Sequence, residues 1–219
     1  MQAGNTYTVS SASTLVLEGL GGLGEDVIRT SVSYVLSAWS EIEVLRTTND
    51  RGKTAINLTG NDFDQLIVGN AGSNILEGKG GADVFTGGAG SDRFVLSNTA
   101  LLGPGNVDTI SDYGKGDVVD VTQILNVAAG TNVVTGGFIR VTTSGLIQVD
   151  VDGGGDDWAT LSTINGNGAV NIRYLSGGVA NTLSVSRTLD ASALTVSHSA
   201  DLSMDVLNSH HQHDALFLL

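Results

Sequence analysis

The chain of 219 residues has no cysteine, one proline and few aromatic residues, which make up 5% of it. The lack of cysteine excludes disulfide frameworks, thiolate metal sites and cysteine nucleophiles. No apolar run is long enough to span a membrane as a helix. Basic residues are also scarce, ten Lys and Arg against 23 Asp and Glu, for a net charge of −13. This balance argues against nucleic acid as a partner, because phosphate neutralisation needs Lys and Arg, and it favours a cation.

Glycine is abundant, with 30 residues, and 41% of the chain is hydrophobic, which argues against wholesale disorder. The length suits one large or two small domains with a substantial core. Residues 60–120 contain nine acids against three bases, so acids and glycines coincide there. The N-terminus from Met1 to Asn5 has neither a positive region nor an apolar stretch, so no conventional N-terminal export signal is expected.

From Gly60 the sequence repeats every nine residues in four units, and the period breaks after Val95. Each unit has glycine at position 1, where a sharp turn can form, and three strand-like residues at its end. Two consecutive units therefore make one coil, with a turn on each side. Stacked coils should bury the position-8 residues between two sheets and align the position-6 oxygens along each edge. Position 8 is Ile67, Leu76, Phe85 and Phe94, and position 6 is Gln65, Asn74, Asp83 and Asp92.

The third and fourth units read Gly-x-Gly-Gly-x-Asp over residues 78–83 and Gly-Gly-x-Gly-x-Asp over residues 87–92. Residues 60–95 therefore resemble the RTX, or hemolysin-type, calcium-binding nonapeptide repeats. The resemblance implies an all-β fold, a parallel β-roll flanked by irregular β-strand caps, and Ca²⁺ as the cofactor. Calcium is a hard cation that takes several oxygen ligands, which carboxylates and turn carbonyls provide.

The candidate calcium ligands follow from this register. Turns on the same edge are two units apart, so Asn74 should lie over Asp92 and Gln65 over Asp83. Two units beyond Asp92 the count reaches residue 110, so the acids on either side of it, Asp108 and Asp112, should continue the Asp92 edge. Two units beyond Asp83 the count reaches Leu101, which is not acidic, so the Asp83 edge should end there. Asp62, Asp64 and Asp26 are either further ligands or solvated acids. The full candidate set is Asp83, Asp92, Asn74, Gly78, Gly80, Gly87, Ala89, Asp62, Asp64, Asp108, Asp112 and Asp26.

We expect three regions: a strand-rich N-terminal cap with a degenerate repeat over residues 1–59, the roll and its capping segment over 60–125, and a β-rich secretion-target region over 126–219. The segment Val107–Leu125 resembles the link between RTX repeats and the target domain of type I secreted proteins, with Tyr113 in place of the usual Phe. The ending Asp214–Leu219 resembles the uncleaved signals of such proteins.

Three other motifs have alternative interpretations. Asp150–Asp157 imitates part of an EF-hand loop, but Gly154 and Leu161 occupy ligand positions, so a polar turn between strands is favoured. Gly19–Gly24 matches a dinucleotide-binding fingerprint, but strand-like alternation follows it, so we reject that site. The histidines of 210–213 offer transition-metal ligands, although a solvated tail is favoured.

No catalytic motif is visible, so we expect a non-catalytic calcium-binding module of a secreted bacterial protein. It would leave the cell unfolded through a type I exporter and fold outside on calcium. The alternative is the C-terminal part of a secreted RTX enzyme, such as a protease, lipase or polysaccharide-modifying enzyme, or of an adhesin. A polysaccharide or cell-surface partner stays open, although the few aromatic residues disfavour a sugar-stacking surface.

Overall fold

The computed structural model describes residues 4–18 and 24–188. Within these ranges every regular element is a β-strand except two 3-10 helices, η1 (Asn98–Leu102) and η2 (Pro104–Asn106). In this part of the chain we find no helix long and apolar enough to cross a membrane. The predictions made for residues 19–23, for the histidines of 210–213 and for Asp214–Leu219 lie outside the described residues.

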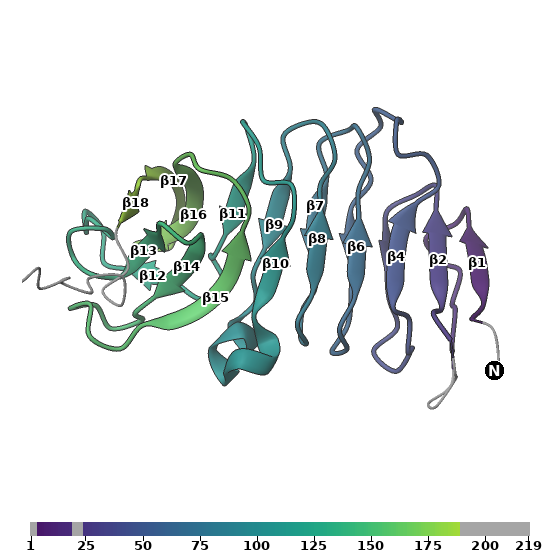
Figure 1. Ribbon diagram of the computed structural model, residues 1–219, viewed down its shortest axis with the longest axis horizontal. Helices are drawn as coiled ribbons and strands as arrows, with labels where there is room; N and C mark the ends of the chain where they lie inside the picture. Colours follow the sequence, from purple (N-terminus) through teal and green to yellow (C-terminus); the bar gives the residue numbers. More distant parts are fainter. Residues whose placement is uncertain (1–3, 19–23, 189–219) are drawn as a thin grey trace, which may run out of the picture. The chain divides into compact units, whose positions relative to one another are not determined.

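The strands form two sheets (Figure 1). Sheet A has the strand order β1 (Thr6–Val9), β2 (Val27–Thr30), β4 (Val44–Thr47), β6 (Leu66–Val68), β8 (Val84–Thr86), β10 (Asp108–Ile110), β15 (Ala159–Ile164), β14 (Leu146–Val149), β13 (Ile139–Thr142) and β18 (Arg187–Thr188). Sheet B has the order β12 (Asn126–Val127), β16 (Val170–Ser176), β11 (Val118–Asp120), β9 (Arg93–Val95), β7 (Ile75–Glu77), β5 (Leu58–Thr59) and β3 (Tyr34–Val35), and β17 (Val179–Val185) also pairs with β16.

Neighbouring strands are parallel through most of both sheets. Parallel pairing runs from β1 to β15 in sheet A and from β3 to β16 in sheet B. Antiparallel pairs among the described strands occur only toward the C-terminal end, at β13–β14, β14–β15 and β16–β17. The predicted all-β fold with a parallel β-roll is therefore confirmed.

The N-terminal strands belong to the same stack as the repeats. Val27 of β2 pairs with Val44 of β4, and Val44 pairs with Leu66 of β6. β4, in the strand-rich segment expected over residues 1–59, is thus the sheet A neighbour of the first repeat strand. Coils of irregular length, which lack the nine-residue period, precede the regular ones.

The glycine-rich half of each repeat turns the chain from one sheet to the other. In the turn 87–92, Gly88 and Gly90 have φ values of 95° and 126°, a region that disfavours side chains. Lys79 occupies the position equivalent to Gly88 one unit earlier, and among the described residues it alone has positive φ without being glycine, at 79°. The first half of the nonapeptide is therefore a turn by backbone conformation.

The register of the coils confirms the two-unit period and shows where it changes. Ile67 pairs with Phe85, which occupies the same position two units later. Phe85 in turn pairs with Ile110, whereas an unbroken period would have paired it with residue 103. The extra residues are 96–102, which contain η1. Beyond them the pattern resumes as two further units, 103–111 and 112–120. The period therefore breaks after Val95, as the sequence indicates, and an insertion hides the last coil from a count of fixed period.

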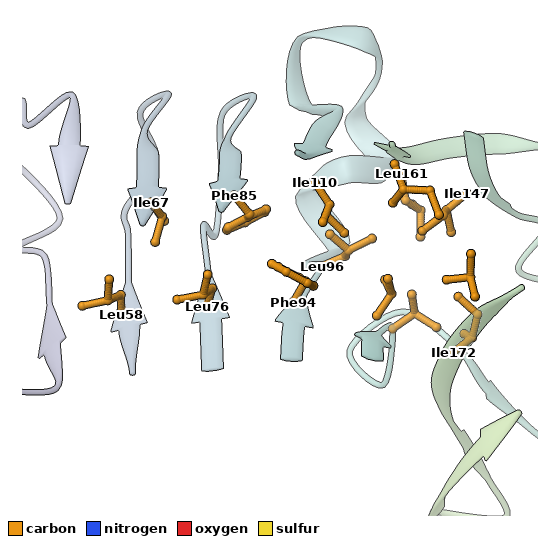
Figure 2. Packing of buried hydrophobic residues seen from close by; sticks show 14 of the residues in the cluster. Leu58, Ile67, Leu76, Phe85, Phe94, Leu96, Ile110, Ile147, Leu161 and Ile172 are labelled. Atoms are coloured by element: carbon orange, nitrogen blue, oxygen red, sulfur yellow. The ribbon is translucent and has the colours of Figure 1, made fainter. Parts of the chain in front are cut away.

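The position-8 side chains fill the space between the sheets (Figure 2). The four predicted ones, Ile67, Leu76, Phe85 and Phe94, are all 0% exposed, and Ile110 continues the row. The rings of Phe85 and Phe94 face each other across the sheets with centroids 6.0 Å apart and a tilt of 54°. Each such side chain contributes about 1.5–3 kcal/mol by burial, so this row supports the roll along its length.

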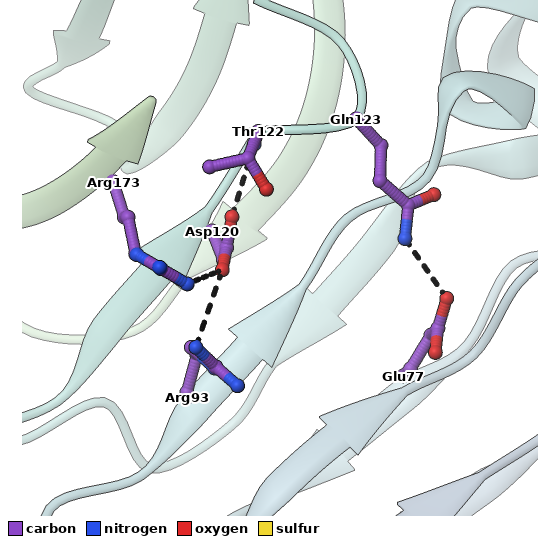
Figure 3. Close-up of polar contacts among 6 residues, drawn as sticks. All are labelled: Glu77, Arg93, Asp120, Thr122, Gln123 and Arg173. Carbon is purple, nitrogen blue, oxygen red and sulfur yellow. Dashed lines mark hydrogen bonds and ion pairs between the residues drawn. The ribbon is translucent and has the colours of Figure 1, made fainter. Parts of the chain in front are cut away.

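An ion-pair cluster on the outer face of sheet B joins the repeats to the C-terminal strands (Figure 3). Arg173 of β16 donates to the buried carboxylate of Asp120 at 2.8 Å, and Arg93 of β9 lies 3.7 Å from the same oxygen. Gln123 donates to Glu77 of β7 at 3.0 Å. Residues of the last regular repeat, the resumed repeat and the C-terminal strands are therefore held together.

Candidate metal centre

The position-6 residues form two columns, one along each edge of the roll. The Asp92 edge consists of the turns 69–74, 87–92 and 112–117, and the Asp83 edge consists of the turns 60–65, 78–83 and 103–108. Strand register places Asn74, Asp92 and Asp117 in one column and Gln65, Asp83 and Asp108 in the other. All six residues are at most 6% exposed. Buried carboxylates therefore stack at the spacing of the strands.

Each carboxylate in these columns accepts a hydrogen bond from the coil before it. Asp92 Oδ1 accepts from the amide of Asn74, and Asp117 Oδ1 accepts from the amide of Asp92, both at 2.8 Å. On the other edge, Asp83 Oδ1 accepts from the amide of Gln65 at 2.8 Å, and Asp108 Oδ1 accepts from the amide of Asp83 at 3.0 Å. One oxygen of each group thus fixes the register between coils.

The second oxygen of the two regular aspartates has no partner. Asp83 Oδ2 and Asp92 Oδ2 are buried and receive no hydrogen bond, although both residues are only 1% exposed. A buried, unpaired anionic oxygen is costly unless a cation compensates it. Among the described residues the ion pairs of Lys and Arg involve Asp50 and Asp120, and neither lies in the columns. The two oxygens therefore fit the ligands that a hard cation requires.

Burial and mutual repulsion raise the pKa values of these carboxyl groups. Desolvation, with repulsion from Asp108, raises the pKa of Asp83 to about 8. Desolvation also raises the pKa of Asp108 to about 7 and that of Asp92 to about 6. The pKa of Asp117 is raised by the same cause. Without a counter-ion the ionised columns therefore oppose the fold, and a divalent cation would relieve this.

The glycines at position 1 make room for the aspartates. A Cβ on Gly78 would collide with Asp83 Oδ2, and a Cβ on Gly87 would collide with Asp92 Oδ2. The predicted residues of position 3 lie in the same turns: Gly80 is buried beside Asp62, whereas Ala89 is exposed. The first glycine, common to the four units, therefore serves the site as well as the turn.

Carboxamides occupy position 6 in the first two units and are satisfied without an ion. Asn74 Oδ1 accepts from the amide of Asn70 at 2.9 Å, and its Nδ2 donates to the carbonyl of Ile56 at 2.8 Å. Gln65 Oε1 accepts from the amide of Asn61 at 3.1 Å. Asn74, although predicted as a ligand, thus has protein partners for both side-chain atoms, and the unpaired charge is concentrated in the later units.

The remaining N-terminal candidates lie along the Asp83 edge. Asp26 is 4% exposed, and its Oδ1 accepts from the amide of Asn5 at 2.6 Å. Asp62 and Asp64 are exposed, and with Glu41 and Glu43 they line a hollow of about 420 Å³. Asp64 also accepts from the amide of Ala82 at 2.7 Å. These acids therefore extend the acidic edge toward the N-terminus.

Of the two acids expected to continue the Asp92 edge, only one lies there. Asp112 accepts from the amides of Gly87 and Gly88 at 2.8 Å, so it lies over the Asp92 turn as predicted. Asp108 instead stacks on Asp83, and that edge does not end near residue 101. The edge predicted for Asp108 is wrong because the insertion 96–102 shifts the repeat along the chain. The spacing argument also missed Asp117, whose signal is an aspartate just before the strand that contains the buried Val119.

The acidic loop at residues 150–157 connects β14 to β15, as expected of a polar turn between strands. It brings carboxylate oxygens of Asp150, Asp152 and Asp156 within 4.8 Å of one another. Asp150 accepts from four backbone amides of its own loop, those of residues 152, 153, 155 and 156. Its buried oxygens are thus satisfied by the backbone, in contrast to Oδ2 of Asp83 and of Asp92.

Comparison with known proteins identifies the repeats. The family model for the RTX calcium-binding nonapeptide repeat matches residues 59–94 in four copies. No curated protein and no solved structure matches the chain. The matched segment covers the four regular units and stops before the insertion and the two resumed units. Residues 59–94 are therefore RTX repeats, a family that binds calcium ions.

Proposed function

We propose that this chain, a calcium-binding module built on RTX repeats, is a non-catalytic folding module of a bacterial protein exported by a type I system. The observation that supports the proposal best is the pair of buried, unpartnered oxygens at Asp83 and Asp92. They lie where the repeats stack, so an ion bound there would act on the fold itself.

The residues that would hold calcium come from successive coils. On the Asp92 edge these are Asp92, Asp112 and Asp117, and on the Asp83 edge they are Asp83 and Asp108, with turn carbonyls completing each set. Calcium would supply the positive charge and oxygen coordination that the columns lack. Because the ligands of one edge belong to different coils and are distant in sequence, they converge only after the coils have stacked. Calcium binding and folding are therefore coupled.

This coupling supports a location outside the cell. Oxygen sites in extracellular modules commonly bind calcium in the range of about 0.1–1 mM, far above the cytosolic concentration. A chain whose columns repel without calcium would stay unfolded before export, which suits passage through a channel. Folding would then follow on contact with external calcium.

The proposed dependence of folding on calcium is tested by circular dichroism in chelator, followed by titration with calcium or with magnesium. We expect strand signal to appear with millimolar calcium, and magnesium to be much less effective because it demands a tighter octahedral site. A spectrum that does not respond to calcium would contradict the proposal.

The proposed export through a type I system is tested with a chain that ends after Thr188, the last residue of the compact unit. In a host with a matching exporter, deletion of residues 189–219 should abolish secretion, whereas the purified truncated protein should still fold with calcium. Export of the truncated chain at the full-length level would show that this segment contains no signal.

A further inference from the structure

A second hollow lies beside the calcium-binding turns, on the side toward the C-terminal strands. It has a volume of about 330 Å³ and is formed by the turn 112–117 and the loop 165–169, with Asn171 and Arg187 on its wall. This volume is at the lower end of small-molecule sites, about 300–1,000 Å³. The hollow is therefore large enough for a ligand of monosaccharide size.

Two of the ten basic residues of this acidic chain line the hollow, Lys115 and Arg187. Neither makes an ion pair with any described residue. Arg187 is held by the carbonyls of Gly168 at 3.1 Å and Thr142 at 3.4 Å, which fix the guanidinium without neutralising it. Two uncompensated positive charges on one small hollow favour an anion.

The nearest acids of the same turn, Asp112 and Asp117, form no ion pair with these two side chains. The carboxylate of Asp112 accepts from the amides of Gly87 and Gly88, and that of Asp117 accepts from the amides of Asp92 and Gly114. Three of these four donors belong to the preceding coil, so both acids are committed to the Asp92 edge. The turn 112–117 therefore presents acids to the calcium site and Lys115 to the hollow.

The remaining groups on the wall suit sugar hydroxyls. Asn171 Nδ2 donates to the carbonyl of Asp117 at 3.0 Å and Asn165 Nδ2 donates to that of Ser111 at 3.2 Å, which leaves both amide oxygens as acceptors. The hydroxyl of Tyr113 is used by its bonds to Asp117 and Asn171, so its ring contributes apolar surface. Cations, amide acceptors and one aromatic ring together match a polar, negatively charged sugar better than a simple ion.

We propose that this hollow binds a carboxylate-bearing sugar unit, with Lys115 and Arg187 contacting the carboxylate and the asparagine amides contacting hydroxyls. This role goes beyond calcium binding. It rests on the proposed function only in that calcium would order the turn 112–117, which forms one wall.

The test uses the isotopically labelled protein in saturating calcium, titrated with galacturonate or with galactose, which differ in the carboxylate alone. Galacturonate should shift the backbone amide signals of residues 113–116 and 165–169 with a dissociation constant on the order of millimolar, and galactose should not. Lys115→Gln should weaken binding about fivefold, the effect of one exposed ion pair. The matched control is Lys53→Gln, which removes the same charge from an exposed turn far along the chain and should leave the constant unchanged.

The inference would be overturned by no shift of these amides with galacturonate, by equal shifts with galactose, or by equal dissociation constants for Lys115→Gln and Lys53→Gln. Shifts centred on the turns 78–83 and 87–92 would likewise overturn it, since galacturonate would then act on bound calcium. The dispersion of the spectrum with and without calcium reports folding separately, so the failure of the sugar site is distinguishable from the failure of calcium-dependent folding.

Discussion

Replacement of Asp92 by asparagine should change the stability of the fold in opposite directions with and without calcium. In calcium-free buffer the ionised carboxylate is buried with Oδ2 unpartnered, and the neutral amide removes that charge. The same position one coil earlier is Asn74, which shows that a carboxamide fits this place in the turn. In calcium, the same substitution removes an anionic ligand.

The magnitude follows from the pKa of Asp92, which burial raises from 3.8 to about 6. At about pH 7.5 this difference corresponds to about 3 kcal/mol of opposition by the ionised group to the calcium-free fold. The new amide N–H groups would be buried without an assured partner, which costs about 1–3 kcal/mol. The net gain is about 1 kcal/mol, or about 3 °C in Tm for a unit of this size.

With calcium present the variant should be the less stable protein. A tenfold loss of calcium affinity would remove about 1.4 kcal/mol of the stabilisation by bound ion. Thermal unfolding followed by circular dichroism measures the effect without calcium, in chelator with sucrose so that the calcium-free fold is populated, and the effect with calcium at millimolar concentration. The matched control is Asp157→Asn, which makes the same charge change at an exposed residue of the loop 150–157. It should change the free energy of unfolding by no more than about 0.5 kcal/mol, with or without calcium.

The result that would refute this reasoning is a calcium-free Tm that falls in Asp92→Asn. It would mean that the carboxylate is stabilised by the protein itself and that Oδ2 needs no cation. A calcium midpoint equal to that of Asp157→Asn would refute the assignment of Asp92 as a ligand.

Three further predictions concern pH, core and turn. In calcium-free buffer with sucrose to populate the fold, thermal melts across a pH series should show stability falling from about pH 5 to pH 8. The reason is that the folded-state pKa of Asp83, about 8, lies above its ordinary value, so the folded chain holds more protons than the unfolded one; rising stability would contradict this. Phe94→Ala should cost about 3–5 kcal/mol in urea unfolding with calcium present, and a loss below about 1 kcal/mol would show that the row of position-8 side chains is not tightly packed. Gly87→Ala should weaken calcium binding measured by calorimetry because its Cβ would meet Asp92 Oδ2, whereas Gly105→Ala, with nothing within 4 Å, should bind as the unmodified chain does.

The nine-residue period was sufficient to predict the strands, turns and core of residues 60–95. Each unit contains its own turn-forming glycines and its own buried residue, so the structure of one unit depends little on distant sequence. The stacking of Asn74 with Asp92 and of Gln65 with Asp83 followed from the same period and is confirmed by the strand register.

The insertion 96–102 marks the limit of that argument. A period counted along the chain cannot show that this segment leaves the stack and that the pattern resumes at Gly103. Only the pairing of Phe85 with Ile110 reveals it, and with it the places of Asp108 and Asp117 in the columns. The unpartnered state of the two buried oxygens is likewise a property of packing, because it depends on which amides the neighbouring coils supply.

The C-terminal strands depend still more on tertiary structure. The sequence predicted a β-rich region over residues 126–219, but not that β15 would pair with β10, which places Asp108 beside Ser162 from a distant part of the chain. That pairing brings the loop 165–169 against the turn 112–117 and so creates the hollow between Lys115 and Arg187. Repeats specify contacts between near neighbours by local pattern, whereas contacts between distant segments depend on which exposed strand edge the later chain can cover. The pairing of distant strands thus depends on the whole chain, and it is seen only in the folded structure.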